Sequence, residues 1–117
     1  MPVVHDDQDA FIQQDVWGGM NVEIIQIREP RDLAPIFRGL PDDMCQCSHW
    51  GYVFKGQLRY QFADHEEVYN AGDLYYLAPG HLPSNDAGTE YIELTSADEI
   101  AETMKIVSKN MADLGGH

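Results

Sequence analysis

The chain has 117 residues, 44% of them hydrophobic and 10% aromatic, which allows one folded domain with a single hydrophobic core. Its 20 acidic side chains against 7 basic ones give a formal net charge of −13, which repels phosphate backbones and anionic lipid head groups and argues against nucleic acid or a membrane surface as partner. No apolar run approaches the roughly 18 residues of a membrane span, and the first residues are acidic rather than basic as in a signal peptide, so we expect a cytoplasmic protein.

The N-terminal segment carries little periodicity. Residues 1–20 are interpreted as an arm, because the stretch up to Asp9 is polar and acidic without an apolar face. The β-branched run at 22–27, bounded by Gly19 and Pro30, predicts the first strand.

Short strands separated by tight turns are predicted for the middle of the chain. Between Cys45 and Phe54, the residues at odd positions share one face of an extended strand, and those at even positions share the other. Turn-forming residues separate the later apolar runs, which predict further strands at 58–62, 68–69, 74–77 and 91–94.

The C-terminal segment changes to a helical period. Apolar residues there are spaced by four and three positions, which predicts an amphipathic helix, and Ser96 with Glu99 fits a capping box at its start. The expected apolar stripe consists of Ile100, Met104, Val107, Met111 and Leu114. Strands followed by one helix, without strand–helix alternation, predict an all-β domain with a C-terminal helix.

Gly56, the pairs Gly72-Asp73 and Pro79-Gly80, and the short strands between them form a pattern over the segment from Asp43 to Leu94. With this pattern the segment resembles the cupin family, small β-barrels built from two motifs that a hairpin separates. The first motif ends in a glycine, which Gly56 matches. Counting back from it places His49 at the family's glutamate, Cys45 at its second histidine and Asp43 at its first.

The second motif opens with a Gly-Asp pair, which Gly72 and Asp73 match, and it turns at a Pro-Gly pair after an apolar strand, as Pro79 and Gly80 do here. The family's histidine follows three residues later, at Pro83 in this chain, whereas His81 comes directly after the glycine. The resemblance implies a cupin-type jelly roll at 21–95, with the arm at 1–20 before it and the helix at 96–117 packed on the barrel or on a dimer partner.

A metal site is the main functional hypothesis. Cys45, Cys47 and His49 share strand parity and so project from one face of the strand. If the barrel closes as the resemblance implies, His81 joins them, and we rank the two histidines first, Cys47 next and Cys45 last. Thiolates and imidazoles favour Zn or Fe, with Ni or Cu as alternatives.

The alternative is that no metal binds. Cysteines are often small buried hydrophobes, and both histidines would then be hydrogen-bonded to backbone groups. Weaker candidates for lining a substrate pocket are Tyr60, Tyr76 and Glu93, for which core packing or an outward ion pair is the competing interpretation.

Three adjacent aromatic residues occupy the other face of the Cys45–Phe54 strand. Trp50, Tyr52 and Phe54 would form an exposed apolar patch unless the terminal helix or a second subunit covers them, and we predict a homodimer.

Two classes of function remain open from the sequence. One is an enzyme in which a mononuclear metal acts on a small organic molecule by oxygenase, lyase or isomerase chemistry. The other is a cupin that binds or senses a small molecule without turnover, or one that holds a purely structural metal through all four thiol and imidazole groups.

Overall fold

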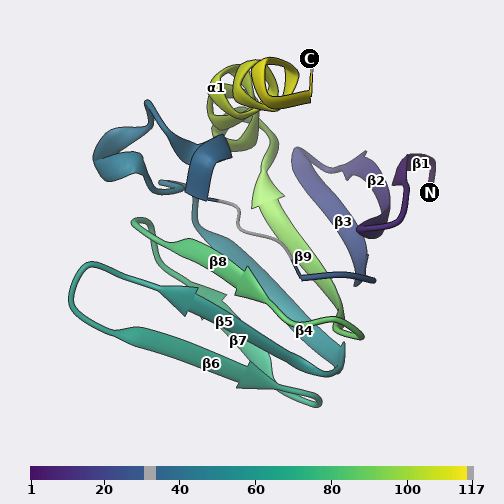
Figure 1. The fold of residues 1–117 in the computed structure, drawn as a ribbon. Coiled ribbons are helices and arrows are strands. Elements are labelled where there is room, and N and C mark those ends of the chain that lie inside the picture. Colours follow the sequence, from purple (N-terminus) through teal and green to yellow (C-terminus); the bar gives the residue numbers. More distant parts are fainter. Residues whose placement is uncertain (31–33, 116–117) are drawn as a thin grey trace.

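The protein consists mostly of antiparallel strands, with one long helix at its C-terminal end (Figure 1). The structure, a computed structural model, describes residues 1–30 and 34–115. In chain order the strands are β1 (Val3–Asp6), β2 (Ala10–Trp17), β3 (Met20–Ile27), β4 (His49–Lys55), β5 (Gln57–Gln61), β6 (Glu66–Asn70), β7 (Leu74–Leu77), β8 (Leu82–Asn85) and β9 (Glu90–Ser96). Two short 3₁₀ turns, η1 (Ala34–Phe37) and η2 (Pro41–Asp43), precede β4, and helix α1 spans Ala97–Gly115. These elements confirm the prediction of an all-β fold with a C-terminal helix.

The strands form two sheets that enclose the core. The larger sheet has the order β1-β2-β3-β9-β4-β7, and the smaller one has the order β6-β5-β8. Side chains from the facing surfaces of both sheets form one buried cluster, as expected for a jelly roll. The buried members of this cluster are Ile25, Val53, Leu58, Tyr60, Phe62, Tyr75, Leu77 and Tyr91.

Strand β4 has the alternation that the sequence predicts. His49, Gly51 and Val53 are buried against the second sheet, whereas Trp50 and Phe54 keep 47% and 49% of their surface exposed on the outer face. The inner face of β4 therefore belongs to the interior, and its outer face is an aromatic surface.

The segment predicted as an arm carries two strands instead. Strand β2 pairs with β3 along its whole length, from Ala10 opposite Ile27 to Trp17 opposite Met20, and β1 adds to the edge beside β2. The Asp7 carboxylate accepts hydrogen bonds from the backbone N–H groups of two following residues and so forms the turn between β1 and β2. Polar side chains are common on an edge strand, and this explains why the segment lacks an apolar period.

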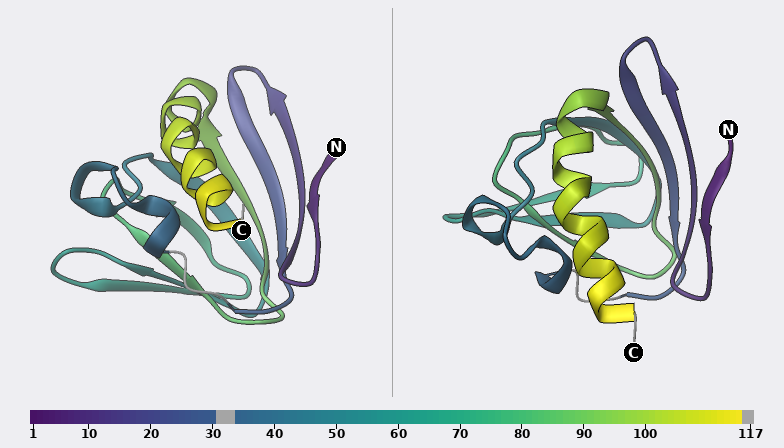
Figure 2. Two further views of the ribbon diagram at one scale, coloured as in Figure 1. Left: turned by 45° about the horizontal axis from the view of Figure 1, so that its top comes forward. Right: turned by 90° about the horizontal axis from the view of Figure 1, so that it is seen from above.

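Helix α1 lies across one end of the β-sandwich, between β3 and the 3₁₀ turns (Figure 2). The Asn110 side-chain amide donates to the carbonyl oxygens of Ile36 and Arg38, which ties the helix to the η1 segment. Of the predicted apolar stripe, Val107 is buried while Met104 is 40% exposed, and the Leu114 side chain lies outside the described part of the chain. Within the described residues, no helix is long and apolar enough to span a bilayer.

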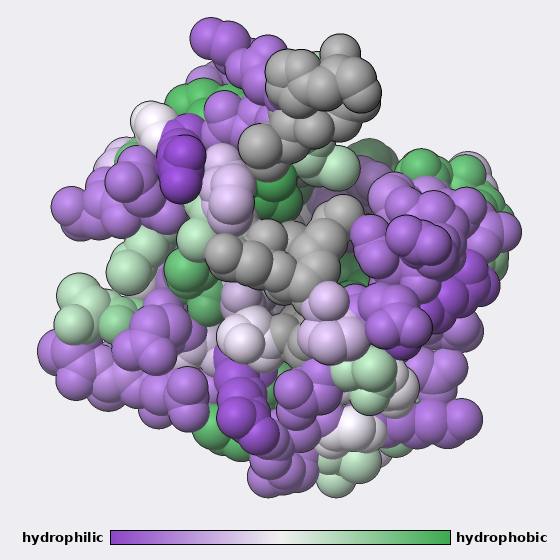
Figure 3. Space-filling model, viewed as in Figure 1, coloured by the Kyte–Doolittle hydropathy of each residue, from purple (hydrophilic) through white to green (hydrophobic). Residues whose placement is uncertain are grey.

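The acidic composition is visible at the surface. Hydrophilic residues cover most of the face seen in Figure 3, and apolar residues show between them in small groups. Charged side chains at these positions remain hydrated, so they need no partner in the fold.

Candidate metal centre

Two backbone segments distant in sequence bring the candidate ligands together. His49 opens β4, and Cys45 lies four residues earlier in an irregular segment. Cys45 and His81 form an isolated antiparallel bridge, in which the Cys45 N–H donates to the His81 carbonyl at 2.9 Å and the His81 N–H returns a bond to Cys45 at 3.1 Å. The bridge fixes the position of His81 against the strand that carries His49.

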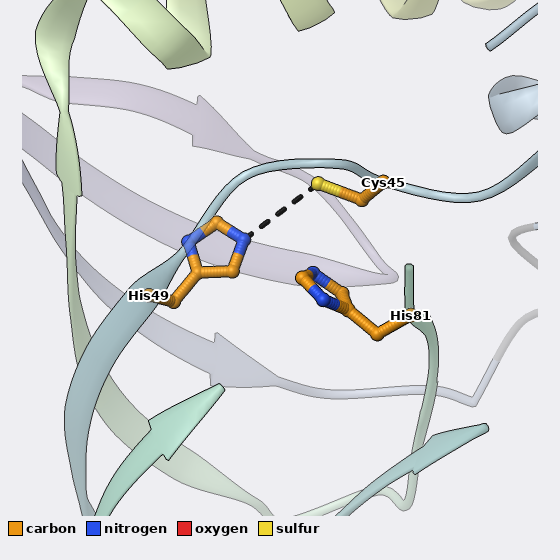
Figure 4. Close-up of side chains that lie close together, drawn as sticks. All are labelled: Cys45, His49 and His81. Atoms are coloured by element: carbon orange, nitrogen blue, oxygen red, sulfur yellow. Dashed lines mark hydrogen bonds between the residues drawn. The ribbon is translucent and has the colours of Figure 1, made fainter. Parts of the chain in front are cut away.

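The three side chains converge in the interior (Figure 4). Cys45 Sγ lies 3.7 Å from His49 Nε2, and one ligand atom from each of Cys45, His49 and His81 lies within 4.8 Å of the others. The two imidazole rings meet edge to face, with centroids 4.9 Å apart. All three residues are buried, at 4%, 6% and 1% exposed surface respectively.

Each imidazole uses its Nδ1 atom in a hydrogen bond within the protein. His81 Nδ1 donates to the Ala78 carbonyl at 2.7 Å, and His49 Nδ1 lies 2.5 Å from the Thr95 hydroxyl oxygen, with a Glu93 carboxylate oxygen at 4.0 Å. A ring whose Nδ1 carries the proton presents the lone pair of Nε2, which is how metal-bound histidines are held in proteins. The Ala78 carbonyl fixes this tautomer for His81, and His49 presents its Nε2 lone pair to the Cys45 sulfur when its Nδ1 atom donates to Thr95.

Burial keeps both histidines neutral. Desolvation lowers the pKa of His49 and of His81 to about 4 in each case. At neutral pH the rings are therefore free to coordinate a cation without first losing a proton.

Cys47 lies beside Cys45, but its sulfur also contacts helix α1. Its sulfur lies 3.0 Å from the Thr103 hydroxyl of α1, so that it faces the helix. A hydrogen bond between the two cysteine sulfurs is the main cause that raises the pKa of Cys45 and lowers that of Cys47 to about 7. Cys45, Cys47 and His49 are all buried, as their shared parity predicts, and among the described residues Cys45 is the cysteine whose sulfur groups with the two histidines. The ranking of the two cysteines as metal ligands stays a prediction.

A buried carboxyl lies beside the histidines. Glu93 of β9 faces inward, where its Oε1 atom accepts hydrogen bonds from the Tyr60 and Tyr75 hydroxyls at 3.2 and 3.1 Å. Burial raises the pKa of Glu93 to about 7, and it also raises the pKa of both phenols, which stay protonated as donors. Tyr60 and Glu93 thus lie together as pocket candidates.

Tyr76 lies apart from this interior group. It pairs with Trp50 on the outer face and is 52% exposed, and its neighbour Tyr75 points inward instead. Gly51 allows this, because a Cβ at that position would lie 2.5 Å from the Tyr75 hydroxyl and from the Ile92 carbonyl oxygen. The register between β4 and β7 decides which tyrosine faces the interior, and a single strand cannot reveal it.

Glu23 was not among the residues predicted from the sequence. This residue lies directly opposite Glu93 in the β3–β9 pairing, so the two carboxyl groups share the inner face. Burial, followed by the neighbouring charge of Glu93, raises the pKa of Glu23 to about 7. The period-2 match between the two strands is the signal that could have found it.

The three converging residues fit a metal ion. In a tetrahedral site with bonds of about 2.3 Å to sulfur and 2.0–2.1 Å to nitrogen, the ligand atoms lie about 3.4–3.6 Å apart. The 3.7 Å between Cys45 Sγ and His49 Nε2 is close to this ligand-to-ligand distance. Small side-chain rotations would bring the ligand atom of His81 to a similar distance from the other two. Two imidazoles and one thiol also form a donor set that suits Zn or another transition metal rather than Mg or Ca.

Comparison with known proteins identifies the fold. No family model and no curated protein sequence matches the chain. An RmlC-like cupin from Shewanella frigidimarina superposes on 82% of this chain and 83% of its own, with a TM-score of 0.57 and 15% identity. The chain has a cupin fold. This confirms the resemblance that the turns and strand spacing predict.

Two further cupin-fold structures differ in length from this chain. The EutQ protein of Clostridium difficile matches 75% of this chain at 12% identity with a TM-score of 0.55, and the chain spans 62% of the length of EutQ. A variant of oxalate decarboxylase from Bacillus subtilis matches 77% of this chain and 26% of its own, at 14% identity and a TM-score of 0.56.

Within the cupin fold, the residues that the motif comparison singled out have different positions. Cys45 and His49 face the interior, whereas Asp43 is exposed and accepts a hydrogen bond from the Gly39 N–H. His81 reaches the group from the residue directly after Gly80, because the bridge to Cys45 turns it inward there.

Proposed function

We propose that the protein binds one divalent transition metal through Cys45, His49 and His81 and acts with it on a small organic molecule. The observation that carries the proposal is that Cys45, His49 and His81 each bring one ligand atom within 4.8 Å of the others, while the Nδ1 atom of each histidine is hydrogen-bonded within the protein. Protein histidines that are hydrogen-bonded only for packing have no need to converge with a thiol in this way.

The donor set favours Zn or Fe, with Ni and Cu as the alternatives. Three protein ligands leave a further position for a small molecule, which distinguishes catalytic sites from closed structural ones. A metal bound there supplies Lewis-acid or oxygen-activating chemistry, of the kind that oxygenases, lyases and isomerases use. The name of oxalate decarboxylase, one of the similar structures, describes a lyase for a small organic acid and supports this reaction class.

The chain provides its own proton-transfer group at this site. Glu93 lies 4.0 Å from His49 Nδ1, and two tyrosine hydroxyls hold its carboxyl in place. A carboxyl with a pKa of about 7 exchanges protons readily at neutral pH, which suits a general acid or base. In this proposal Tyr60 and Tyr75 orient Glu93, and Glu93 moves the proton.

Elemental analysis of protein purified without chelator tests the metal. We expect about one transition-metal ion per chain in the wild type and a loss of most of it in both His49→Ala and His81→Ala, because each substitution removes one of three ligands. His65→Ala is the matched control, since His65 is exposed between Asp64 and Glu67 and lies outside the group. Equal metal content in all four proteins would remove the proposal.

We also propose that the protein is a homodimer that buries the outer face of β4 and β7. Trp50, Tyr52, Leu74 and Tyr76 lie on this face in paired positions, and each exposes more than a third of its surface. Isolated monomers rarely present an apolar patch of this kind. Tyr52→Lys should shift the molar mass measured by light scattering from dimer toward monomer, while Val68→Lys on β6 should not, and a monomeric wild type would contradict the proposal.

A further inference from the structure

A cavity of about 520 Å³ lies between helix α1 and the inner face of β2 and β3. Its volume falls within the range of pockets that hold small molecules. Cys45, His49 and His81 do not line it, so it is separate from the candidate metal centre.

Most of the cavity wall is apolar. Alternate residues of β2 and β3 pair across the strands, Ala10 with Ile27 and Ile12 with Ile25, so their side chains share the inner face. The opposite wall comes from the helix side of the molecule rather than from the smaller sheet. It is formed by Ile36 of η1 with Ile100, Met104, Ser108 and Met111 of α1.

The polar groups at one end of the cavity form a chain that leaves acceptors free. The Gln14 side-chain N–H donates to the Asn21 side-chain oxygen, and the Asn21 N–H donates to Glu23 Oε1 at 2.9 Å. Glu23 Oε2 and Gln14 Oε1 receive no hydrogen bond from any described residue, although both side chains line the cavity. Both oxygens can therefore accept hydrogen bonds from a ligand that brings donors into the cavity.

Among the described residues that line the cavity, the carboxyl groups of Glu23 and Glu29 face no lysine or arginine of the same lining. His5, which also lines the cavity, lies 2.7 Å from an Asp7 carboxylate oxygen. A carboxylate or phosphate ligand would be repelled from this lining, whereas a cation would be attracted.

We propose that this cavity binds a small primary amine with an apolar body, whose ammonium group donates hydrogen bonds to Glu23 and Gln14. An ammonium carries three N–H donors and no acceptor, so it can donate to the Glu23 Oε2 and Gln14 Oε1 atoms at this end of the cavity. The aliphatic or aromatic body of the amine packs between Ile12, Ile25 and Met104. A neutral alcohol of the same length would fill the apolar part but would leave the carboxylate without a counter-charge.

Calorimetry with matched probes tests the proposal on the full chain. The probes are n-hexylamine, 2-phenylethylamine, n-hexanol and hexanoate. We expect at least one amine to bind with an affinity about tenfold or more above that of hexanol, because a charge-assisted hydrogen bond adds to the same apolar contact, and we expect hexanoate not to bind.

Three variants assign the binding to the cavity. Glu23→Gln keeps the side-chain shape but removes the charge, and Ser108→Phe fills the cavity from the exposed helix side, so both should weaken amine binding by about tenfold or more. Glu102→Gln makes the same charge change on the exposed face of α1 and should leave the affinity unchanged.

Each other outcome overturns the proposal. Failure of both amines to bind at millimolar concentration, equal affinity for amine and alcohol, tighter binding of hexanoate, or undiminished amine binding in Glu23→Gln would do so. The metal proposal is tested separately, since His49→Ala should lose metal and still bind the amine.

Discussion

The inner face of the larger sheet has two halves that differ in what covers them. On the β4 side the second sheet closes over the face, and His49, His81 and Glu93 each have hydrogen-bond partners within the protein. On the β2 and β3 side the cover is a helix, and a cavity of about 520 Å³ remains beneath it. Two sheets pack at a distance that side chains fill, whereas a helix crossing the end of a sandwich leaves gaps. Side chains alternate inward along the strands of both halves. On the β4 side they form a fixed group of potential metal ligands, and on the β2 and β3 side they line a cavity large enough for a small molecule.

Glu23 lies at the boundary of the two halves, and its ionisation, together with that of Glu93, is expected to have the largest effect on stability. Its pKa is about 7 in the folded protein against 4.5 for an unperturbed glutamate, so folding favours the protonated form. The contribution is fully present below pH 4.5 and is lost as the pH rises through 7, at a cost of up to about 3 kcal/mol. Glu23→Gln, which cannot ionise, should therefore gain stability relative to the wild type between pH 4.5 and pH 8, as measured by urea unfolding.

The histidine contributions do not obscure this comparison. His49 and His81 have lowered pKa values, so they destabilise the fold as the pH falls from about 6.5 toward 4, but they do so in both proteins and cancel in the difference. Glu102→Gln is the surface control. A stability difference between Glu23→Gln and the wild type that stays constant with pH would show that this carboxyl is hydrated rather than buried.

Substituting the two cysteines one at a time separates metal binding from the packing contact with helix α1. Cys45→Ala should lower metal affinity by more than the roughly 10- to 100-fold that loss of a supporting hydrogen-bond partner costs, since it removes a ligand. Cys47→Ala should keep the metal and lose about 1 kcal/mol of unfolding free energy, because it breaks the contact with Thr103. Metal titration and urea unfolding of both variants measure the two effects.

The opposite pattern would identify a different ligand set. If Cys47→Ala loses the metal while Cys45→Ala retains it, the segment before β4 must turn over when the ion binds, and the contact with Thr103 would then belong to the metal-free state.

Local patterns predicted the fold well because each element has its own period. The alternation in β4, the turn residues between the later strands and the four-and-three spacing of α1 all act within a few residues, and the structure confirms them. The strands of the first 20 residues were missed because pairing with β3, rather than any apolar period of their own, forms them. Sheet propensity depends on such neighbours.

The candidate site was predictable only in part, because it depends on contacts between strands. His49 and His81 could be singled out from their spacing, but the bridge that orients Cys45 joins residues 36 positions apart. The choice of Tyr75 over Tyr76 follows from the β4–β7 register, and the juxtaposition of Glu23 and Glu93 follows from the β3–β9 register. Register is a tertiary property that no single strand encodes.

The isolated bridge between Cys45 and His81 also affects the order of assembly. His81 can meet the other two ligands only after the loop formed by the intervening residues, including the four strands β4 to β7, has closed on itself. Closing a loop of this length has an entropic cost that nascent local structure does not offset. A cation bound by the assembled Cys45, His49 and His81 would stabilise the closed loop. It would therefore stabilise the folded chain after folding rather than nucleate folding.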